Sequence, residues 1–387
     1  MHRGLRKNYG EIYKIDAFGD ISLFIHNPRD AQTLLNNEGS QPILPGFHQL
    51  AEFRRSEFPE YFSETTGLVS QGEEWSMTRQ LVQQDMMRSR AAEFYIEDIE
   101  NIAEELVEKL SEVKDKDGNV NIGEYMKEYA LECTGDIFLG SRLGVLQGSK
   151  IGKTMIEQVG KFSKLSLPLF FFPLYVSKWM PFYKDLKIAS EQILRISKDK
   201  IVEAQKEFSS KESILVKLIN RCGKDSNIPV AMALDALAGG IDTTGNSASF
   251  LLYHIARNPE KQEKLFKEIL ETVGREGSIC AKSLAKMRYL KACQKESQRL
   301  LPVTAGSARQ TQVEMCLGGY QVPVGTKVIR WGMVASTCST NFAQPDAFIP
   351  ERWIRGSSEH QKTPPYAFLP FGHGKRLKED KIPRFTN

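Results

Sequence analysis

The sequence has few cysteines and no long apolar run. Its six cysteines, among 387 residues, show no Cys-x-x-Cys spacing and no pairing with histidines, which argues against a zinc site and against a disulfide framework. A reducing compartment is therefore expected. The most apolar stretch, LSLPLFFFPLYV at 165–176, is only twelve residues long and contains two prolines, whereas a membrane-spanning helix needs about 20 apolar residues. It could still line an apolar entrance or dip into a membrane interface.

A strong excess of charge is also lacking. The formal net charge is +4 and no nucleic-acid-binding motif gathers the basic residues, so we expect no nucleic-acid partner. Hydrophobic residues make up 41% and charged residues 26%, which is typical of a globular protein. No internal repeat or low-complexity linker interrupts the chain. We therefore predict one domain over residues 1–376, followed by an unrelated charged tail at 377–387.

What the sequence does have is extensive helical periodicity. From about residue 73 to about residue 275, apolar residues recur every three or four positions with charged residues between them. Short β-like runs stand at the start of the chain and again after Pro302, where Gly-Gly and Pro-Val-Gly turns separate them. These patterns predict a mainly α fold with small β-sheets.

The longest predicted helix begins near Pro229 and ends before the Asn-Pro pair at 258–259. Its centre reads AGGIDTT, and two adjacent glycines cost roughly 2 kcal/mol of helix propensity relative to alanines. One interpretation is that a flat partner approaches the backbone at 238–240, where the helix widens locally, while Asp242 and Thr243 deliver protons to a bound group. The other is an ordinary crossing of two helices through small residues.

Two further groups of residues are spaced so as to share one face of a helix. Glu296 and Arg299 precede a helix-ending proline, and Arg352 lies downstream in a segment rich in proline and aromatic residues. They predict either a surface ion pair or a buried Glu296 shared by two guanidiniums, which would fix a loop on a helix. Trp75 and Arg79 suit either an apolar plate that bears carboxylates or a simple cation-π pair.

A glycine-rich basic turn, PFGHGKR, occupies positions 370–376. The Gly-Lys-Ser/Thr end of a phosphate loop is absent from it. Taken in order, WSMTR, AGGIDTT, KESQR, IPERW and FLPFGHGKR resemble the motifs of the cytochrome P450 family, the haem-thiolate monooxygenases. The resemblance runs from about residue 9 to residue 376, points to the mitochondrial, ferredoxin-reduced branch of invertebrate type, and implies the cytochrome P450 fold.

The resemblance implies a haem b cofactor and a role for each candidate residue. Asp242 and Thr243 match the proton-relay positions of the long helix. A buried carboxylate and guanidinium network behind the haem is matched by Glu296, Arg299 and Arg352. The residues implied to contact the haem or to bind its propionates are Trp75, Arg79, Ala238, Gly239, Arg309, Phe371 and Arg376.

The same resemblance implies partners and a location. Lys291 and Lys295 match the paired lysines that dock an acidic ferredoxin of the adrenodoxin type, and such docking is sensitive to salt. The substrate would be lipophilic, either steroid-like or a xenobiotic, with contacts from 302–306. Segment 165–176 would lid the substrate channel and touch the membrane. The implied location is the mitochondrial inner membrane, with peripheral contact.

The resemblance breaks at position 378. The family's loop reads Phe-Gly-x-Gly-x-Arg-x-Cys, in which the cysteine thiolate binds the iron, and Lys378 stands at that position here. An ammonium offers no lone pair unless it loses its proton, so we expect this chain to be inactive. With no apolar signal region at its start and a charged tail at 377–387, the sequence is interpreted as incomplete at both ends. The alternatives are a non-catalytic truncated isoform that binds ferredoxin or apolar ligands, and a misprocessed gene product.

Overall fold

The computed structural model describes residues 2–17, 19–86, 91–206, 213–223 and 225–376, so Lys378 and the tail at 377–387 lie outside the described residues. The chain forms two compact units. Residues 1–45 and 250–387 make up the first, here called the sheet unit, and residues 46–249 make up the second, here called the helical unit. Each unit is described by itself, and the single domain expected over 1–376 stays a prediction.

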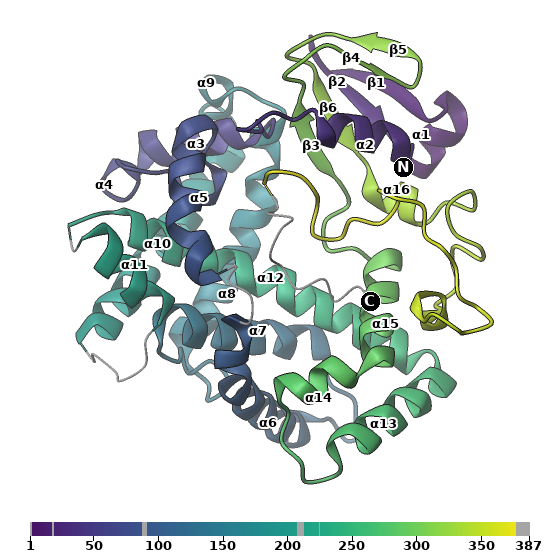
Figure 1. The fold of residues 1–387 in the computed structure, drawn as a ribbon. Helices are drawn as coiled ribbons and strands as arrows, with labels where there is room; N and C mark the ends of the chain where they lie inside the picture. Colours follow the sequence, from purple (N-terminus) through teal and green to yellow (C-terminus); the bar gives the residue numbers. More distant parts are fainter. Residues whose placement is uncertain (1, 18, 87–90, 207–212, 224, 377–387) are drawn as a thin grey trace. The chain divides into compact units, whose positions relative to one another are not determined.

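Helices dominate the described residues, and the strands form two small sheets (Figure 1). This confirms the predicted mainly α class. In the sheet unit, a four-stranded sheet has the order β1-β2-β6-β3, and β2 pairs parallel with β6 while the other pairs are antiparallel. Its strands are β1 (Ile12–Ala17), β2 (Asp20–Ile25), β6 (Lys327–Arg330) and β3 (Ser307–Gln310).

The second sheet is a hairpin of β4 (Met315–Leu317) and β5 (Tyr320–Val322). Gly318 and Gly319 form its turn with φ angles of 57° and 86°. Glycine adopts this left-handed conformation without steric cost, which is why Gly-Gly favours a tight hairpin. The Gly-Gly signal in the sequence therefore marks a hairpin in the structure.

One core of the sheet unit lies between these strands and helix α2 (Pro28–Asn36). The helix begins where the Asn27 side chain accepts a hydrogen bond from the Arg29 backbone N–H, and Pro28 occupies its first position. The buried residues packed together here are Ile25, Ala31, Leu34, Met315, Leu317, Val322 and Val328. Short strands and one capped helix thus bury a continuous apolar cluster.

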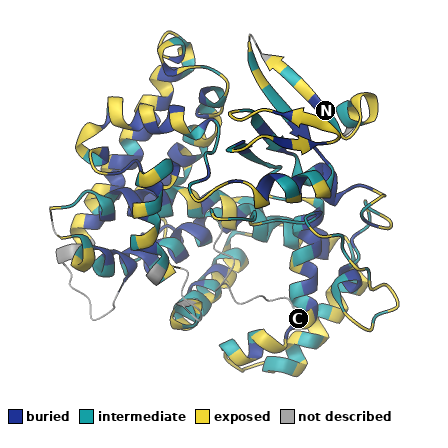
Figure 2. Ribbon diagram, turned by 45° about the horizontal axis from the view of Figure 1, so that its top comes forward, coloured by how far each residue is buried: buried dark blue, intermediate teal, exposed yellow. Residues whose placement is uncertain are grey.

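The other helices of the sheet unit differ in how far they are buried. No residue of α13 (Pro259–Val273) is buried, whereas α15 (Arg288–Leu300) buries Glu296 and Arg299 among others; Figure 2 colours buried residues dark blue and exposed ones yellow. The remaining elements of this unit are α1 (His2–Tyr9), α14 (Ala281–Lys286), α16 (Gly332–Ser336) and the 3-10 helix η4 (Pro350–Trp353).

The helical unit is built around one large apolar cluster, in which Leu131, Leu169, Leu186, Leu218 and Ile241 are fully buried. Its helices are α3 (Phe47–Glu57), α4 (Pro59–Phe62), α5 (Gly72–Met86), α6 (Ile96–Val113), α7 (Ile122–Leu139), α8 (Lys150–Leu165), α9 (Leu174–Ser177), α10 (Pro181–Lys206) and α11 (Ile214–Cys222). Its 3-10 helices are η1 (Gly67–Val69), η2 (Ala91–Tyr95) and η3 (Leu167–Phe170).

Helix α12 (Ile228–Ala256) begins in the helical unit, and its last residues belong to the sheet unit. Its first turn contains Pro229 and it ends before Asn258, as the sequence predicted. Pro259 then opens α13 at the first helical position. The proline signals therefore located both ends of the longest helix.

A buried ion pair joins α3 to α12 inside the helical unit. Arg54 donates two hydrogen bonds to Asp235, from Nη2 to Oδ1 at 2.6 Å and from Nη1 to Oδ2 at 3.1 Å. Asp235 also accepts a hydrogen bond from the Leu68 backbone N–H at 2.7 Å, and Arg54 donates to the Thr66 carbonyl at 2.7 Å. At Gly67, where φ is +73°, a Cβ would lie 2.0 Å from Asp235 Oδ2. The pair therefore fixes the segment around Gly67 to α12.

Removing the charge of Asp235 should destabilise the helical unit strongly. In Asp235→Asn the buried guanidinium of Arg54 loses its carboxylate, and such a loss typically costs about 3–5 kcal/mol of unfolding free energy. Urea unfolding followed by circular dichroism measures the change. The control is Glu157→Gln, which breaks the exposed pair with Lys161 and should cost about 0–1 kcal/mol. Equal stability of the two variants would show that the buried pair contributes little.

Candidate functional site

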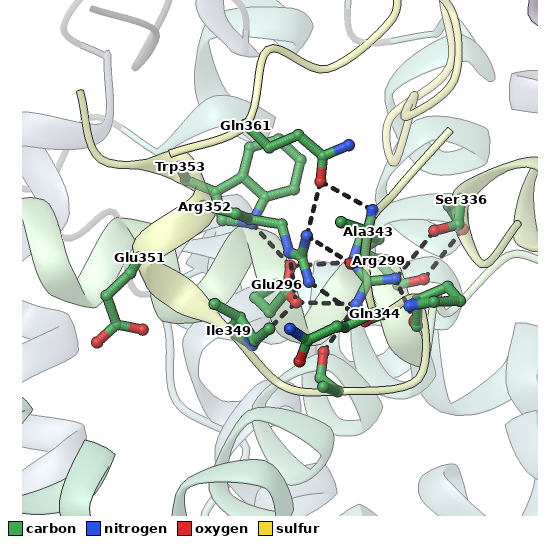
Figure 3. A network of polar contacts seen from close by, with 12 residues as sticks. Glu296, Arg299, Ser336, Ala343, Gln344, Ile349, Glu351, Arg352, Trp353 and Gln361 are labelled. Atoms are coloured by element: carbon green, nitrogen blue, oxygen red, sulfur yellow. Dashed lines mark hydrogen bonds and ion pairs between the residues drawn. The ribbon is translucent and has the colours of Figure 1, made fainter. Parts of the chain in front are cut away.

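The predicted site residues of the sheet unit include a network centred on the fully buried carboxylate of Glu296 (Figure 3). Arg299 donates to it from Nε at 2.9 Å and from Nη2 at 2.8 Å, and Arg352 donates from Nε at 2.9 Å. The Ile349 backbone N–H and Trp353 Nε1 complete its shell at 3.0 and 2.9 Å. The sequence left two alternatives for Glu296, a surface ion pair or a buried carboxylate shared by two guanidiniums, and the structure has the second.

The remaining guanidinium hydrogens of the network hold the chain that follows α16. Arg299 donates to three backbone carbonyls, those of Ser336, Pro345 and Ala347, at 2.6–3.0 Å. Arg352 donates to the carbonyl of Ala343 and to the side-chain oxygen of Gln361. Figure 3 shows the side chains of η4 and of the segments on either side of it gathered around Glu296 and Arg299 of α15. Every charge is paired and hydrogen-bonded, which is the condition for burying ion pairs.

Glu351, the neighbour of Arg352, was not anticipated from the sequence. Its carboxylate accepts hydrogen bonds from Lys261 at 3.2 Å, Lys264 at 2.9 Å and the Tyr289 hydroxyl at 3.0 Å. Burial alone would raise the pKa of Glu351, but hydrogen bonds led by that of Lys264 outweigh it and lower the pKa to about 2. The cluster ties α13 and α15 to η4. Its members come from three separate segments of the sequence, so no local pattern could have revealed it.

The glycine-rich turn PFGHGKR lines a cavity of about 320 Å³ within the sheet unit. Three of the predicted cofactor-binding residues, Arg309, Phe371 and Arg376, contribute to its lining. The other lining residues are Leu44, Thr304, Gly306, Ser307, Arg330, Leu369, Pro370, Gly372 and His373. Within this set three residues are arginines and none is acidic, so the lining of the cavity is cationic.

Glu38 positions the turn from outside the lining of the cavity. Its buried carboxylate accepts hydrogen bonds from Arg309 Nε and from the Lys375 backbone N–H. Gly374 has a φ of +91°, and a Cβ there would lie 2.1 Å from Glu38 Oε1. Only glycine allows the turn to come this close to the carboxylate. Arg376 in turn donates to the Pro42 carbonyl at 3.0 and 3.2 Å.

The cavity fits the carboxylate end of a haem. A haem carries two propionates, and guanidiniums are the side chains best suited to bind carboxylates. One guanidinium nitrogen of Arg330, Nη1, is buried and has no hydrogen-bond partner among the described residues. The donors present therefore match an anionic group. The position of the iron ligand, Lys378, lies outside the described residues.

The helical unit holds the predicted pair Trp75 and Arg79, both on α5. Trp75 is buried, and Arg79 has two buried nitrogens, Nε and Nη2, without a hydrogen-bond partner among the residues that the structure describes. Burial lowers the pKa of Arg79. A guanidinium in this state suits an anionic ligand group, which agrees with the predicted use of Arg79.

The two glycines at the centre of α12 fit different interpretations, one the crossing of two helices and the other an accessible backbone. A Cβ at Gly240 would lie 2.3 Å from Thr134 Oγ1 on α7, so Gly240 serves a crossing of two helices. Gly239 is exposed, and a Cβ there would meet nothing within 4 Å, so it leaves backbone accessible. Ala238 is half-buried beside it. The two glycines thus have different roles, one in packing and one on an open face.

The predicted widening of α12 at 238–240 is wrong. The helix is α-helical throughout, and the Thr243 hydroxyl donates to the Gly239 carbonyl at 2.7 Å without opening the helix. Thr243 is exposed on the same face as Gly239. Asp242 instead pairs with Lys127 of α7 at 2.8 Å and accepts a hydrogen bond from Ser163 of α8 at 3.2 Å.

The two lysines predicted to dock a ferredoxin are neighbours on α15. Lys291 donates to the Ala285 carbonyl at 3.0 Å. The Lys295 ammonium lies 5.9 Å from the centre of the Trp353 ring, and burial followed by the charge of Lys291 lowers its pKa. Both side chains are half-buried, with their charges on the same helix face.

Two features are absent from the described residues. No group of three or more His, Cys, Asp or Glu residues there is arranged to hold a metal ion. Among the described helices, none combines the length and the apolar character that a bilayer crossing requires.

Comparisons with known proteins agree with the motifs. The sequence model of the family described as cytochrome P450 matches residues 1–377. The chain is 31% identical over 400 residues to "Probable cytochrome P450 12b2, mitochondrial" of Drosophila melanogaster, covering 97% of this chain and 74% of that protein. It is 29% identical to "Probable cytochrome P450 49a1" of the same fly, covering 96% and 68%, and 29% identical to "Cytochrome P450 CYP12A2" of Musca domestica, covering 96% and 75%. The predicted resemblance to invertebrate members of this family is confirmed.

The lowered pKa of Glu351 predicts a pH-dependent contribution to stability. Its pKa is about 2 in the folded chain and ordinarily 4.5, so the carboxylate favours folding above about pH 4.5, and this effect is lost as the pH falls towards 2. We expect Glu351→Gln to unfold at lower urea concentration than the unaltered chain at pH 7, and the difference to shrink between pH 4.5 and pH 2. The exposed Glu359→Gln serves as control. A difference that is constant over this pH range would contradict the assignment.

Proposed function

Because the chain belongs to the cytochrome P450 family, whose members are haem-dependent monooxygenases, we propose that its scaffold serves the oxidation of a lipophilic substrate, steroid-like or xenobiotic, by O2. The observation that carries the proposal is the cationic cavity lined by Arg309, Phe371 and Arg376. A bound haem would supply the activation of O2 for insertion of one oxygen atom into the substrate.

In this proposal, the residues of the chain bind and orient. Within the sheet unit, Arg309 and Arg376 hold propionates. Within the helical unit, Trp75 and Arg79 have the role that the family resemblance implies for them. Gly239 and Thr243 share an open face of α12, and Ala238 lies beside it, which suits contact with a flat ligand. Thr243 and Asp242 carry protons. The Lys127 and Ser163 contacts of Asp242 hold its carboxylate in one orientation.

We further propose that electrons come from a ferredoxin of the adrenodoxin type in the mitochondrion. The names of several relatives include the word mitochondrial, and Lys291 and Lys295 place two positive charges on one face of α15. An acidic protein would be attracted to this face, and the attraction would weaken as salt screens it.

Replacing both lysines should weaken ferredoxin binding. For Lys291→Gln with Lys295→Gln we expect about tenfold weaker binding at low salt, since charge pairs at a protein surface contribute about 1 kcal/mol or less each. The binding constant is measured by calorimetry at several salt concentrations. Lys267→Gln, an exposed change on α13, is the control. Binding that is unaffected by salt in the unaltered chain would rule out electrostatic docking.

Membrane contact is proposed for the segment that contains η3 and α9. Four large apolar side chains spaced four residues apart are exposed there, Leu167, Phe171, Tyr175 and Trp179, and Trp179 is 91% exposed. Exposed aromatic and aliphatic side chains of this kind favour the interface of a bilayer. This observation supports peripheral membrane contact, for which the resemblance implies the mitochondrial inner membrane.

Removing the aromatic members of this patch should release the protein from lipid. Burial of one large apolar side chain contributes about 1.5–3 kcal/mol, so Phe171→Ser with Trp179→Ser should lower binding at least about tenfold. The measurement is co-sedimentation with vesicles of phosphatidylcholine and cardiolipin. Val107→Ser, on the exposed surface of α6, controls for general loss of apolar surface. Unchanged sedimentation of the double variant would refute the proposed contact.

A second candidate function follows from Lys378. We propose that this chain forms no thiolate-ligated haem, because Lys378 stands at the position of the ligand cysteine and an ammonium does not replace a thiolate. Its cation-lined cavity and its ferredoxin-binding face would then serve binding without oxidation.

The spectrum of the reduced carbon-monoxide complex distinguishes the two functions. With added haem, we expect the unaltered chain to give either no haem spectrum or one without the thiolate-type band, while Lys378→Cys supplies the missing donor as a comparison. Absorbance difference spectroscopy gives the answer directly. A thiolate-type band from the unaltered chain would contradict the non-catalytic proposal and restore catalysis as the function of this chain.

A further inference from the structure

Arg330 ends strand β6 and turns its side chain into the cationic cavity. The residue is only 5% exposed. Gly332 makes room for it, since a Cβ there would lie 2.8 Å from Arg330 Nη2. No motif in the sequence singled out this residue, and the neighbouring site residues were assigned without it.

The guanidinium of Arg330 is poorly satisfied by the protein. Its two hydrogen bonds, from Nε to Ser307 Oγ and from Nη2 to the Leu369 carbonyl, are both 3.5 Å long. Nη1 is buried without a partner among the described residues. By contrast, Arg299, which is also buried, makes five hydrogen bonds of 2.6–3.0 Å. Bonds at 3.5 Å are at the outer limit of hydrogen bonding, so Arg330 lacks the contacts of a structural arginine.

The charges around Arg330 are also unbalanced. Arg309 lines the same cavity, and the nearby Glu38 is already engaged by Arg309 and by the Lys375 backbone. None of the lining residues is acidic. Burial, and then the charge of Arg309, lower the pKa of Arg330 to about 10, so it remains protonated at neutral pH. A buried cation without a counter-ion is costly and is offset only by an anion.

We propose that Arg330 binds a carboxylate in this cavity. Two carboxylates are chemically suitable, a propionate of the haem and the acid group of a bound apolar ligand. The inference rests on the proposed function, since it places the anion in the cavity assigned there to the haem. A guanidinium binds a planar carboxylate through paired N–H donors, and its unpartnered Nη1 and weakly bonded Nη2 are adjacent donors of that kind.

The test compares charged and neutral versions of each ligand. The full-length chain, Arg330→Met and the exposed control Arg355→Met are titrated with haemin and with haemin dimethyl ester, in which both propionates are esterified. The same proteins are titrated with dodecanoate and dodecanol. Because a hydrogen bond to a charged group contributes about 1.5–3 kcal/mol, Arg330→Met should reduce the preference for one of the acids about tenfold or more. Arg355→Met should leave both preferences unchanged.

The outcomes separate the two carboxylates. A reduced preference for haemin over its ester assigns Arg330 to a propionate, and a reduced preference for dodecanoate over dodecanol assigns it to the acid group of a ligand. No change in either preference, or no preference in the unaltered chain, overturns the proposal. These titrations measure ligand binding and do not depend on a thiolate-type band. A negative result for Arg330 can therefore be distinguished from a negative result for the proposed oxidation.

A second measurement guards against a variant that does not fold. Without ligand, Arg330→Met removes an unbalanced buried charge, so its thermal midpoint should be equal to or higher than that of the unaltered chain. Haemin should then raise the midpoint of the unaltered chain more than that of the variant. If Arg330→Met fails to fold or melts at lower temperature without ligand, Arg330 is a structural residue and the proposal is wrong.

Discussion

The buried carboxylate of Glu296 is the interaction on which the sheet unit depends. A carboxylate removed from water is costly unless its lone pairs are all used, and here two guanidiniums, a backbone N–H and an indole N–H use them. The same guanidiniums hold backbone carbonyls over the segment from Ser336 to Ala347. A long stretch with little regular structure is therefore held in place by side chains of α15 and η4 rather than by strands.

Five arginines with buried nitrogen atoms differ in how completely the protein supplies hydrogen-bond partners to them. Arg54, Arg299 and Arg352 have a buried acidic partner and bonds to backbone carbonyls. In Arg79 and Arg330, some side-chain nitrogen atoms are also buried, but these atoms have no hydrogen-bond partner among the described residues. The first group stabilises the chain by itself, whereas the second stabilises it only in combination with an anion.

Local sequence signals correctly predicted those features that depend on residues close together in the sequence, such as helix ends and turns. The ends of α12 followed from Pro229 and the Asn-Pro pair, and the hairpin followed from Gly-Gly. The three-residue spacing of Glu296 and Arg299 correctly suggested one helix face. By contrast, the different roles of Gly239 and Gly240 depend on Thr134, which is distant in the sequence, and the expected widening of α12 does not occur. Arg330 was missed because alternation in a strand shows which residues turn inward, not how well their charges are satisfied.

The parallel pairing of β2 with β6 has a consequence for synthesis. The hairpin of β1 and β2 is complete by residue 25, but its partner strand begins only at Lys327, and the whole helical unit is made between them. At a translation rate of about 5–20 residues per second, the edge of β2 that pairs with β6 stays unpaired on the order of tens of seconds. During this time the helical unit can already fold as a continuous segment, so the order of chain emergence favours helices first and the sheet last.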